Sequence, residues 1–234
     1  MHISVVIPAY NEEKYLPQCL EALRHQSYPR SRYEVIVVDN ASTDSTAAIA
    51  RSFDVRVVPE PKKSVAQARQ TGARAAQGSI IAGTDADAIP PTDWLTTIAE
   101  LFTPNHGLGG VTGPVYLYDG TGLERWYTRY INNGVVRLTH VIGKGCFSGN
   151  NFAVQVEPFW QVGGFNTGIQ GAEDADLSVR LGKVTRVDFA PRLTMSISSR
   201  RAREGYWKVI SRAGINYMRV LWLGIPPTDQ TDIR

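Results

Sequence analysis

The sequence predicts one α/β domain whose core is a mostly parallel β-sheet. Up to Pro90, apolar runs alternate with segments of helical period in the order β-α-β-α-β-α-β, which is the pattern of right-handed crossovers in such a sheet. The chain has 234 residues, of which 43% are hydrophobic, and this suffices for one sizeable core. Neither an internal repeat nor a low-complexity linker interrupts it, so we expect the second half to complete the same body.

Four strands and three helices are predicted in the first half of the chain. Each strand is a near-continuous apolar run, as expected for strands that are covered on both faces. The first helix repeats leucine at positions 16, 20 and 23, is capped by Asn11, and tolerates Pro17 only in its first turn. The strands are predicted over 3–9, 34–38, 55–58 and 79–83, and the later two helices over 42–53, capped within 42–44, and from Ser64 to a stop at Gly78.

After Pro90 the pattern changes to a mixture of helices and strands. Helices are predicted over 92–102, 123–138, 172–181 and 206–223, and strands over 111–118, 184–189 and 193–197. Residues 143–151 are rich in glycine and are predicted to form a loop. Five aromatic residues could stack on sugar faces in an acceptor cleft, but aromatic residues at helical spacing favour a place in the core. They are Trp126, Tyr127, Tyr130, Phe147 and Trp160.

Composition excludes several classes of protein. The net charge is +3 and the pI is about 8.9, and this excess of positive charge is too small to indicate a nucleic-acid partner. Cys19 and Cys146 lie far apart, so we expect neither a disulfide framework nor a structural zinc site, and a reducing cytoplasm is the expected location. No long apolar stretch is present, and we expect neither a membrane span nor a signal peptide.

Two carboxylates one residue apart, Asp85 and Asp87, follow the apolar run 79–83. In an open α/β sheet, ligands bind outside the carboxyl ends of the strands. A hard divalent cation there takes oxygen ligands from few residues, and water or a diphosphate supplies the others. The pair therefore predicts a metal and phosphate site at an exposed strand end; the alternative is a polar turn that caps the next helix.

Six short motifs stand in the order seen in family 2 glycosyltransferases with the GT-A fold, and the chain resembles that family from about residue 3 to residue 201. The motifs are VIPAYNE at 6–12, VVDNASTD at 37–44, TDAD at 84–87, GNN at 149–151, VGGF at 162–165 and ED at 173–174. Each is weak alone, and together they are specific. The resemblance implies a Rossmann-like GT-A domain over 1–201, in which 1–90 bind the nucleotide sugar and 91–201 form the acceptor side; 202–234 would be a C-terminal helix and tail.

The resemblance implies that the donor nucleotide binds at the end of the first strand. There the backbone of Pro8 and Ala9 would contact the base or ribose, Tyr10 would lie against the base, and Glu12 would accept hydrogen bonds from ribose hydroxyls. Asp39 would accept an N–H from uracil or guanine, and a UDP donor is favoured over GDP. The alternatives are that Glu12 caps a helix and that Asp39 belongs to a turn.

The resemblance also implies a divalent cation, Mn²⁺ or Mg²⁺, at the diphosphate. Asp87 would be its direct ligand, and Asp85 a ribose or water-mediated partner. Arg69 would donate to phosphate or carbonyl oxygens. All four histidines precede the ED motif, so the downstream histidine ligand of several GT-A enzymes is missing. Either diphosphate and water complete the coordination, or Arg200 and Arg201 neutralise part of the charge.

Asp174 is implied to be the general base of an inverting transfer, which removes the proton of an acceptor hydroxyl. The alternative is an acidic first turn that stabilises the helix dipole. Two other functions stay open: a sugar-nucleotide nucleotidylyltransferase, although its Gly-rich basic loop after the first strand is missing, and a nucleotide- or glycan-binding module without turnover.

The expected partners are a nucleoside-diphosphate sugar and a glycan or lipid-linked acceptor. Residues 206–223 form a basic amphipathic pattern that would place the protein peripherally on the inner face of an anionic membrane. The alternative is a helix that packs on the transferase body or on a second copy in a homodimer.

Overall fold

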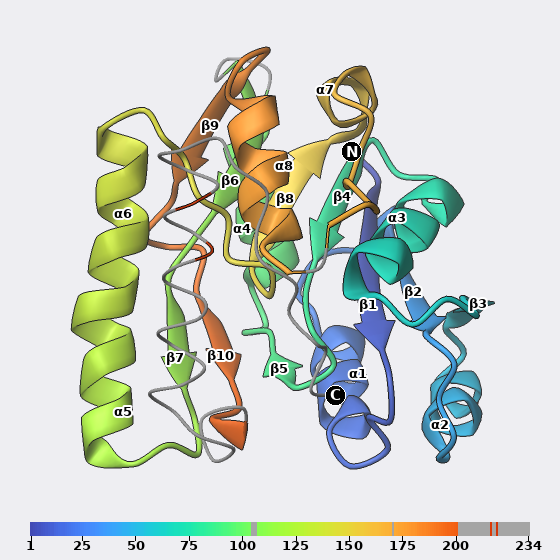
Figure 1. The fold of residues 1–234 in the computed structure, drawn as a ribbon. Helices are drawn as coiled ribbons and strands as arrows, with labels where there is room; N and C mark the ends of the chain where they lie inside the picture. Colours follow the sequence, from blue (N-terminus) through green and yellow to red (C-terminus); the bar gives the residue numbers. More distant parts are fainter. Residues whose placement is uncertain (104–106, 170, 201–215, 217–218, 220–234) are drawn as a thin grey trace.

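The structure is a computed structural model that describes residues 1–103, 107–169, 171–200, 216 and 219 (Figure 1). The strands are β1 (Ile3–Ala9), β2 (Tyr33–Asp39), β3 (Arg56–Pro59), β4 (Ile80–Gly83), β5 (Ala88–Ile89), β6 (Leu108–Thr112), β7 (Val115–Leu117), β8 (Phe152–Gln155), β9 (Arg186–Phe189) and β10 (Met195–Ile197). The helices are α1 (Leu16–Arg24), α2 (Thr46–Ser52), α3 (Val65–Ala75), α4 (Trp94–Leu101), α5 (Gly122–Trp126), the π-helical segment η2 (Tyr127–Asn132), α6 (Asn133–Val141), α7 (Val156–Gln161) and α8 (Glu173–Leu181), with a short turn η1 (Arg30–Arg32).

Seven strands form the main sheet in the order β3-β2-β1-β4-β8-β6-β9. All its neighbouring pairs are parallel except those of β8, which runs antiparallel to both β4 and β6. The predicted mostly parallel α/β sheet is confirmed. A smaller sheet, β5-β10-β7, stands beside it.

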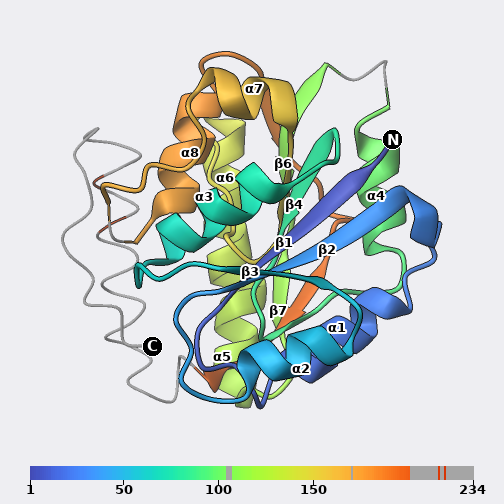
Figure 2. The same ribbon diagram turned by 90° about the vertical axis from the view of Figure 1, so that its right-hand side faces the viewer.

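Side chains of the main sheet build one core on each face. Along β1, Ile3, Val5 and Ile7 join the core that α1 and α4 cover, whereas Val6 joins the core that α3, α7 and α8 cover. This follows from the alternation of side chains along a strand. Figure 2 shows α3 and α8 on one side of the sheet and α4 on the other.

Helix α3 lies unusually close to the main sheet. A Cβ atom on Gly72 would come within 2.3 Å of Val6 Cγ1 and 2.9 Å of Val38 Cγ2, so only glycine permits this approach. Ser64 begins the helix as predicted, since its side chain accepts the Gln67 N–H. The close contact fixes α3 against β1 and β2 and holds Arg69, one turn before Gly72, beside the sheet edge.

Two predicted helices begin later than expected. Asn11 does not cap α1: it has a left-handed φ of 54°, its side chain accepts the Thr43 N–H at 2.8 Å, and α1 begins at Leu16 with Pro17 in its first turn. Helix α2 begins at Thr46, and the Asp44 carboxylate accepts the Thr46 N–H. In both cases polar loop residues bond to a neighbouring loop or turn instead of extending the helix.

The strand predicted over 111–118 is two strands in different sheets. Pro114 lacks an N–H and cannot continue the ladder of β6, so the chain leaves the main sheet there and forms β7. Strand β8 was not predicted, because a strand of four residues with three of them buried carries no periodic signal.

The helix predicted over 123–138 is one continuous element, α5-η2-α6, which begins with a capping box between Thr121 and Glu124. Trp126 and Tyr130 are not in the core: they are 52% and 58% exposed. The predicted helix over 206–223 lies outside the described residues. In the described part of the chain, no helix is long and apolar enough to cross a membrane.

Candidate active site

Five carboxylates gather at the edge of the main sheet where β1 and β4 end. They come from the loop after β1, the loop after β4 and the first turn of α8. They are Glu12, Asp85, Asp87, Glu173 and Asp174, and none is more than 6% exposed. Because burial of an unpaired carboxylate is strongly unfavourable, cations or hydrogen-bond donors must lie beside them.

Arg69 on α3 joins the loop after β4 to the first turn of α8. Its Nη2 donates to Asp85 Oδ1 at 2.8 Å, and its Nη1 donates to Glu173 Oε1 at 2.9 Å. Burial acts to lower the pKa of Arg69, but the neighbouring carboxylates, Glu173 foremost, outweigh burial and raise this pKa, so the guanidinium stays charged. Arg69 therefore sets the position of α8 relative to the Asp85 loop.

Gly149 of the GNN motif lies flat against this ion pair. A Cβ atom there would come within 2.5 Å of Arg69 Nη1 and 2.9 Å of Asp174 Oδ2. Any side chain would therefore displace the guanidinium or the carboxylate. This explains why the loop needs glycine between α6 and β8.

Loss of Arg69 is expected to destabilise the protein strongly. Arg69→Met keeps the apolar stem but leaves the buried carboxylates of Asp85 and Glu173 without their cation, so the free energy of unfolding should fall by about 3–5 kcal/mol. Urea unfolding followed by circular dichroism measures this. The matched control Arg74→Met, at an exposed position of the same helix, should stay within about 0.5 kcal/mol of wild type. Equal stability of Arg69→Met and the control would contradict the bridging role.

Arg200 is the second cation of the site. Its Nε donates to Asp87 Oδ2 at 2.7 Å, its Nη1 donates to Glu12 Oε2 at 2.6 Å, and its Nη2 also donates to Glu12. Its guanidinium carbon lies 4.5 Å from the centre of the Tyr15 ring. Burial acts to lower the pKa of Arg200, but the bonds to Glu12 and Asp87 outweigh burial and raise it. Arg200 thus forms an ion pair with Asp87, the carboxylate that is predicted to bind metal.

The segment before Arg200 is held in place by Asp119, which follows β7. Asp119 accepts the Ser198 hydroxyl at 2.8 Å and the Ser199 N–H at 2.5 Å. On the other side, the Ser198 N–H donates to the carbonyl oxygen of Asp87 at 3.2 Å. Asp119 therefore positions Arg200 over Asp87, a role that the sequence did not reveal.

The predicted nucleotide residues lie along the ends of β1 and β2. Lys63 Nζ donates to the Tyr10 hydroxyl at 2.7 Å and lies 4.4 Å from the centre of that ring. Asp39 Oδ1 accepts the Ser42 N–H at 3.1 Å, as in the turn alternative, and its side chain is only half-buried. The Ala9 carbonyl accepts the Asn40 N–H at 2.8 Å.

The loops after β1 and β2 are joined by hydrogen bonds. The Asn11 N–H donates to Ser42 Oγ at 3.1 Å, and the Glu12 N–H donates to Thr46 Oγ1 at 2.7 Å. These bonds fix the approach of Glu12 to the site without using its carboxylate. The two loops therefore form one rigid edge beside Tyr10 and Asp39.

The donor set fits a hard divalent cation that a diphosphate helps to hold. All candidate ligands are carboxylate oxygens, the kind that Mg²⁺ and Mn²⁺ prefer. Among the described residues no group of three or more His, Cys, Asp or Glu side chains is arranged around one metal position.

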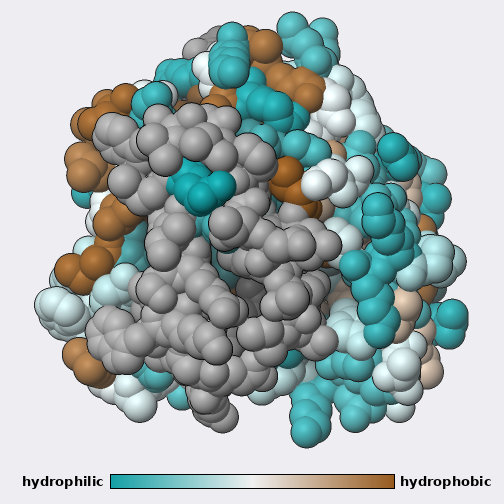
Figure 3. Space-filling view, in the orientation of Figure 1, coloured by the Kyte–Doolittle hydropathy of each residue, from teal (hydrophilic) through white to brown (hydrophobic). Residues whose placement is uncertain are grey.

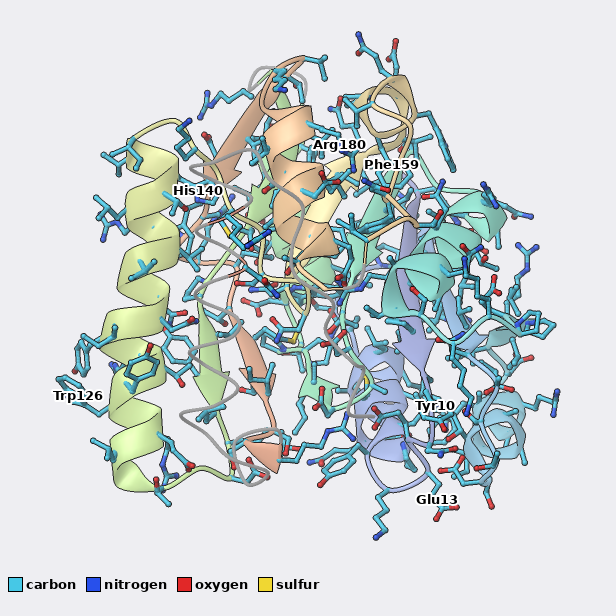
Figure 4. All side chains as sticks on the ribbon, viewed as in Figure 1. Tyr10, Glu13, Trp126, His140, Phe159 and Arg180 are labelled. Carbon is cyan, nitrogen blue, oxygen red and sulfur yellow. The ribbon has the colours of Figure 1, made fainter. Side chains whose placement is uncertain are left out.

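The structure brings most of the predicted site residues together. Pro8, Ala9, Tyr10 and Asp39 lie at the ends of β1 and β2. Glu12, Asp85, Asp87 and Asp174 belong to the carboxylate cluster, which Arg69 and Arg200 pair with; Arg201 lies outside the described residues. Figure 4 shows Tyr10 near the carboxyl end of β1. Glu173 and Asp119 were missed as site residues. Burial raises the pKa of both cysteine thiols, Cys19 and Cys146, which disfavours their thiolate forms.

The family model described as Glycosyl transferase family 2 matches residues 4–163. The glycosyltransferase AglE of Haloferax volcanii is 39% identical over 135 residues, which are 53% of this chain and 43% of that protein. The dolichyl N-acetyl-alpha-D-glucosaminyl phosphate 3-beta-D-2,3-diacetamido-2,3-dideoxy-beta-D-glucuronosyltransferase of Methanococcus voltae is 31% identical over 107 residues, which are 43% of this chain and 33% of that protein. The chain thus spans less than half the length of these two relatives.

Solved structures show the same fold. The mannosyltransferase PcManGT from Pyrobaculum calidifontis, in complex with GDP-Man and Mn²⁺, superimposes with a TM-score of 0.76 and 25% sequence identity, over 93% of this chain and 63% of that one. The predicted GT-A fold is confirmed by this similarity together with the strand order of the main sheet.

Proposed function

The chain belongs to glycosyltransferase family 2, and we propose that it transfers one sugar from a nucleoside-diphosphate donor to a hydroxyl group of an acceptor, with inversion at the anomeric carbon. The observation that carries this proposal is the joint placement of Asp87 and Asp174. They come from distant parts of the sequence, and the Arg69 bridge between Asp85 and Glu173 holds their two loops together.

In the proposed reaction, Asp174 accepts the proton of the acceptor hydroxyl. The hydroxyl oxygen then bonds to the anomeric carbon from the face opposite the diphosphate, while the bond from that carbon to the phosphate oxygen breaks. The nucleoside diphosphate leaves with the bonding electron pair and gains negative charge. Stabilising that charge is the main catalytic requirement.

Asp87, with Asp85 beside it, would hold a divalent cation that neutralises charge on the leaving diphosphate when bound. The complex of the similar mannosyltransferase with Mn²⁺ supports a divalent cation as the cofactor. Arg200 donates a hydrogen bond to Asp87, so a cation that binds Asp87 would compete with Arg200 for this carboxylate. Its guanidinium then becomes available to phosphate oxygens, for which its planar fork is suited.

For the donor we propose a uracil nucleotide, with guanine as the alternative. Asp39 can accept an N–H from either base, and the similar mannosyltransferase holds GDP-Man. The acceptor proposed is a glycan or lipid-linked hydroxyl. The dolichyl N-acetyl-alpha-D-glucosaminyl phosphate in the name of the Methanococcus voltae relative supports the lipid-linked class.

A thermal-shift panel with UDP, GDP, their sugars and Mn²⁺ tests the donor proposal. A ligand present at about 100 times its dissociation constant should stabilise the fold by about 2.7 kcal/mol. We expect UDP with Mn²⁺ to raise the melting temperature more than either alone and more than GDP with Mn²⁺. A larger shift with GDP would assign guanine, and no shift with any nucleotide would contradict the function. Product formation from NTP and sugar phosphate would instead identify a nucleotidylyltransferase.

A further inference from the structure

The continuous helix α5-η2-α6 has its polarity reversed with respect to an ordinary surface helix. Its buried positions are polar: Thr128, Asn133 and Thr139. The Asn133 amide donates to the Val115 carbonyl at 2.9 Å and its oxygen accepts the Val115 N–H at 3.0 Å, which anchors the helix to β7. A surface helix normally turns its apolar stripe toward the core. In this helix a polar side chain, Asn133, makes the hydrogen bonds to the neighbouring strand β7.

Large apolar side chains cover the opposite side of this helix. Six of them, each more than half exposed, define what we term the apolar face: Leu123, Trp126, Tyr130, Val135, Leu138 and Val141. They recur every three to five residues, the spacing of one side of a helix that contains a wider π turn. Figure 4 shows Trp126 pointing away from the body, and Figure 3 shows hydrophobic atoms along the same edge of the molecule.

The same helix carries exposed positive charge. Arg125, Arg129 and Arg137 are all exposed, and the helix has one acidic residue, Glu124. Glu124 is engaged in the capping box, where its carboxylate accepts the Thr121 N–H at 2.7 Å. The apolar face is therefore accompanied by arginines with long flexible stems and no compensating row of acids.

We propose that the apolar face docks on an anionic lipid membrane, with the helix lying in the plane of the headgroups. Apolar burial would supply the main attraction, and the three arginines would bind lipid phosphates. Tryptophan and tyrosine suit this boundary because each has an apolar ring and a polar group. This contact is distinct from one through 206–223, and it does not depend on the proposed transferase activity.

Charge argues against a second copy of the chain as the occupant. A two-fold contact places the same patch on both subunits, so the arginines of one helix would face those of the other without acidic partners. An anionic bilayer supplies the missing negative charge. The contact also orients the site, since η2 packs on β7, and β7 pairs with β10, the strand that leads into Arg200.

Flotation of the full chain with vesicles tests the proposal. We expect binding to phosphatidylglycerol vesicles at low salt and little binding to phosphatidylcholine. The double variant Trp126→Gln, Leu138→Gln should lower the partition coefficient on the order of 100-fold through lost apolar burial. The triple variant Arg125→Gln, Arg129→Gln, Arg137→Gln should lower it by about fivefold per arginine, and added salt should remove that difference.

Matched controls change the same residue types elsewhere. Trp160→Gln with Val184→Gln alters two residues that are 39% and 43% exposed outside the helix, and Arg32→Gln, Arg51→Gln, Arg74→Gln removes the same charge from other exposed positions. Both controls should float like wild type. The proposal is overturned if wild type does not float, if helix variants float like their controls, or if sedimentation shows a dimer that the apolar variants dissociate.

Discussion

Asp174→Asn is expected to abolish sugar transfer while donor binding persists. The amide has nearly the shape of the carboxylate but cannot accept the acceptor proton, so kcat should fall by about 10²–10⁴-fold. The local structure supports a clean substitution: Asp174 Oδ1 accepts the Ala175 N–H at 2.8 Å, and an amide oxygen can accept the same bond. The Arg69 bridge to Glu173 is untouched.

Single-turnover assays with a labelled donor and calorimetric titration of the nucleotide with Mn²⁺ separate chemistry from binding. The matched control is Asp176→Asn, one half-turn further along α8, where the carboxylate pairs with Arg180 at 2.6 Å on the partly exposed side. We expect that control to keep transfer within a few-fold of wild type. If Asp174→Asn behaves in the same way, another group is the base.

The sequence predicts those parts of the fold whose signal is local. Strand β1 is buried at every position and apolar at all but Ser4, and its ends were predicted as observed. The parallel order of the first half was predicted as well. Strand β8 is only four residues long and pairs with β4 and β6, so tertiary contacts define it and no periodicity marks it. Pro114 was a signal in the sequence that the strand predicted over 111–118 is interrupted there. Which sheet the following strand β7 joins depends on the position of β10, and that is not visible in the sequence.

The same distinction applies to the site. Asp85, Asp87 and Asp174 were predicted because they follow a strand or begin a helix within recognisable motifs. The ion pairs that hold them join Arg69 to Glu173 and Arg200 to Glu12, across 104 and 188 positions of the chain. The packed fold decides which residues pair at such separations, so these ion pairs cannot be predicted from one sequence. Asp119 was missed for the same reason.

The helix α5-η2-α6 contradicts the expectation that the apolar side of a surface helix faces the core. Aromatic residues at helical spacing favour a core position, yet Trp126 and Tyr130 are exposed while Asn133 is buried. The signal that was available is the polar residues on the other side of the helix. Among them, the Asn133 amide bonds to Val115 of β7, and the Thr139 hydroxyl bonds to the Val136 carbonyl in the helix itself. Periodicity finds the two sides of a helix, but it does not say which side faces the protein.

Asp87→Ala is expected to abolish the stimulation of donor turnover by Mn²⁺, because it removes the proposed direct ligand. The sequence indicated an exposed strand end that tolerates the change freely. The structure corrects this: Asp87 is 5% exposed and accepts a hydrogen bond from Arg200. A loss of about 1–3 kcal/mol in stability is therefore expected as well, and Arg200 should stay ordered through its two bonds to Glu12.

Arg200→Gln provides the opposing variant, since Arg200 and the metal compete for the same carboxylate. Without the guanidinium, Asp87 is available to the cation, and Mn²⁺ should bind to the nucleotide-free protein about fivefold to tenfold more tightly, the size of a partly exposed ion pair of roughly 1 kcal/mol. Asp87→Ala should weaken the same binding by at least as much. Electron paramagnetic resonance of free Mn²⁺ measures both variants without requiring turnover. Because the two substitutions are predicted to move metal affinity in opposite directions, a general loss of structure cannot mimic the result; wild-type affinity in Asp87→Ala, or weaker binding in Arg200→Gln, would show that the cation is held elsewhere.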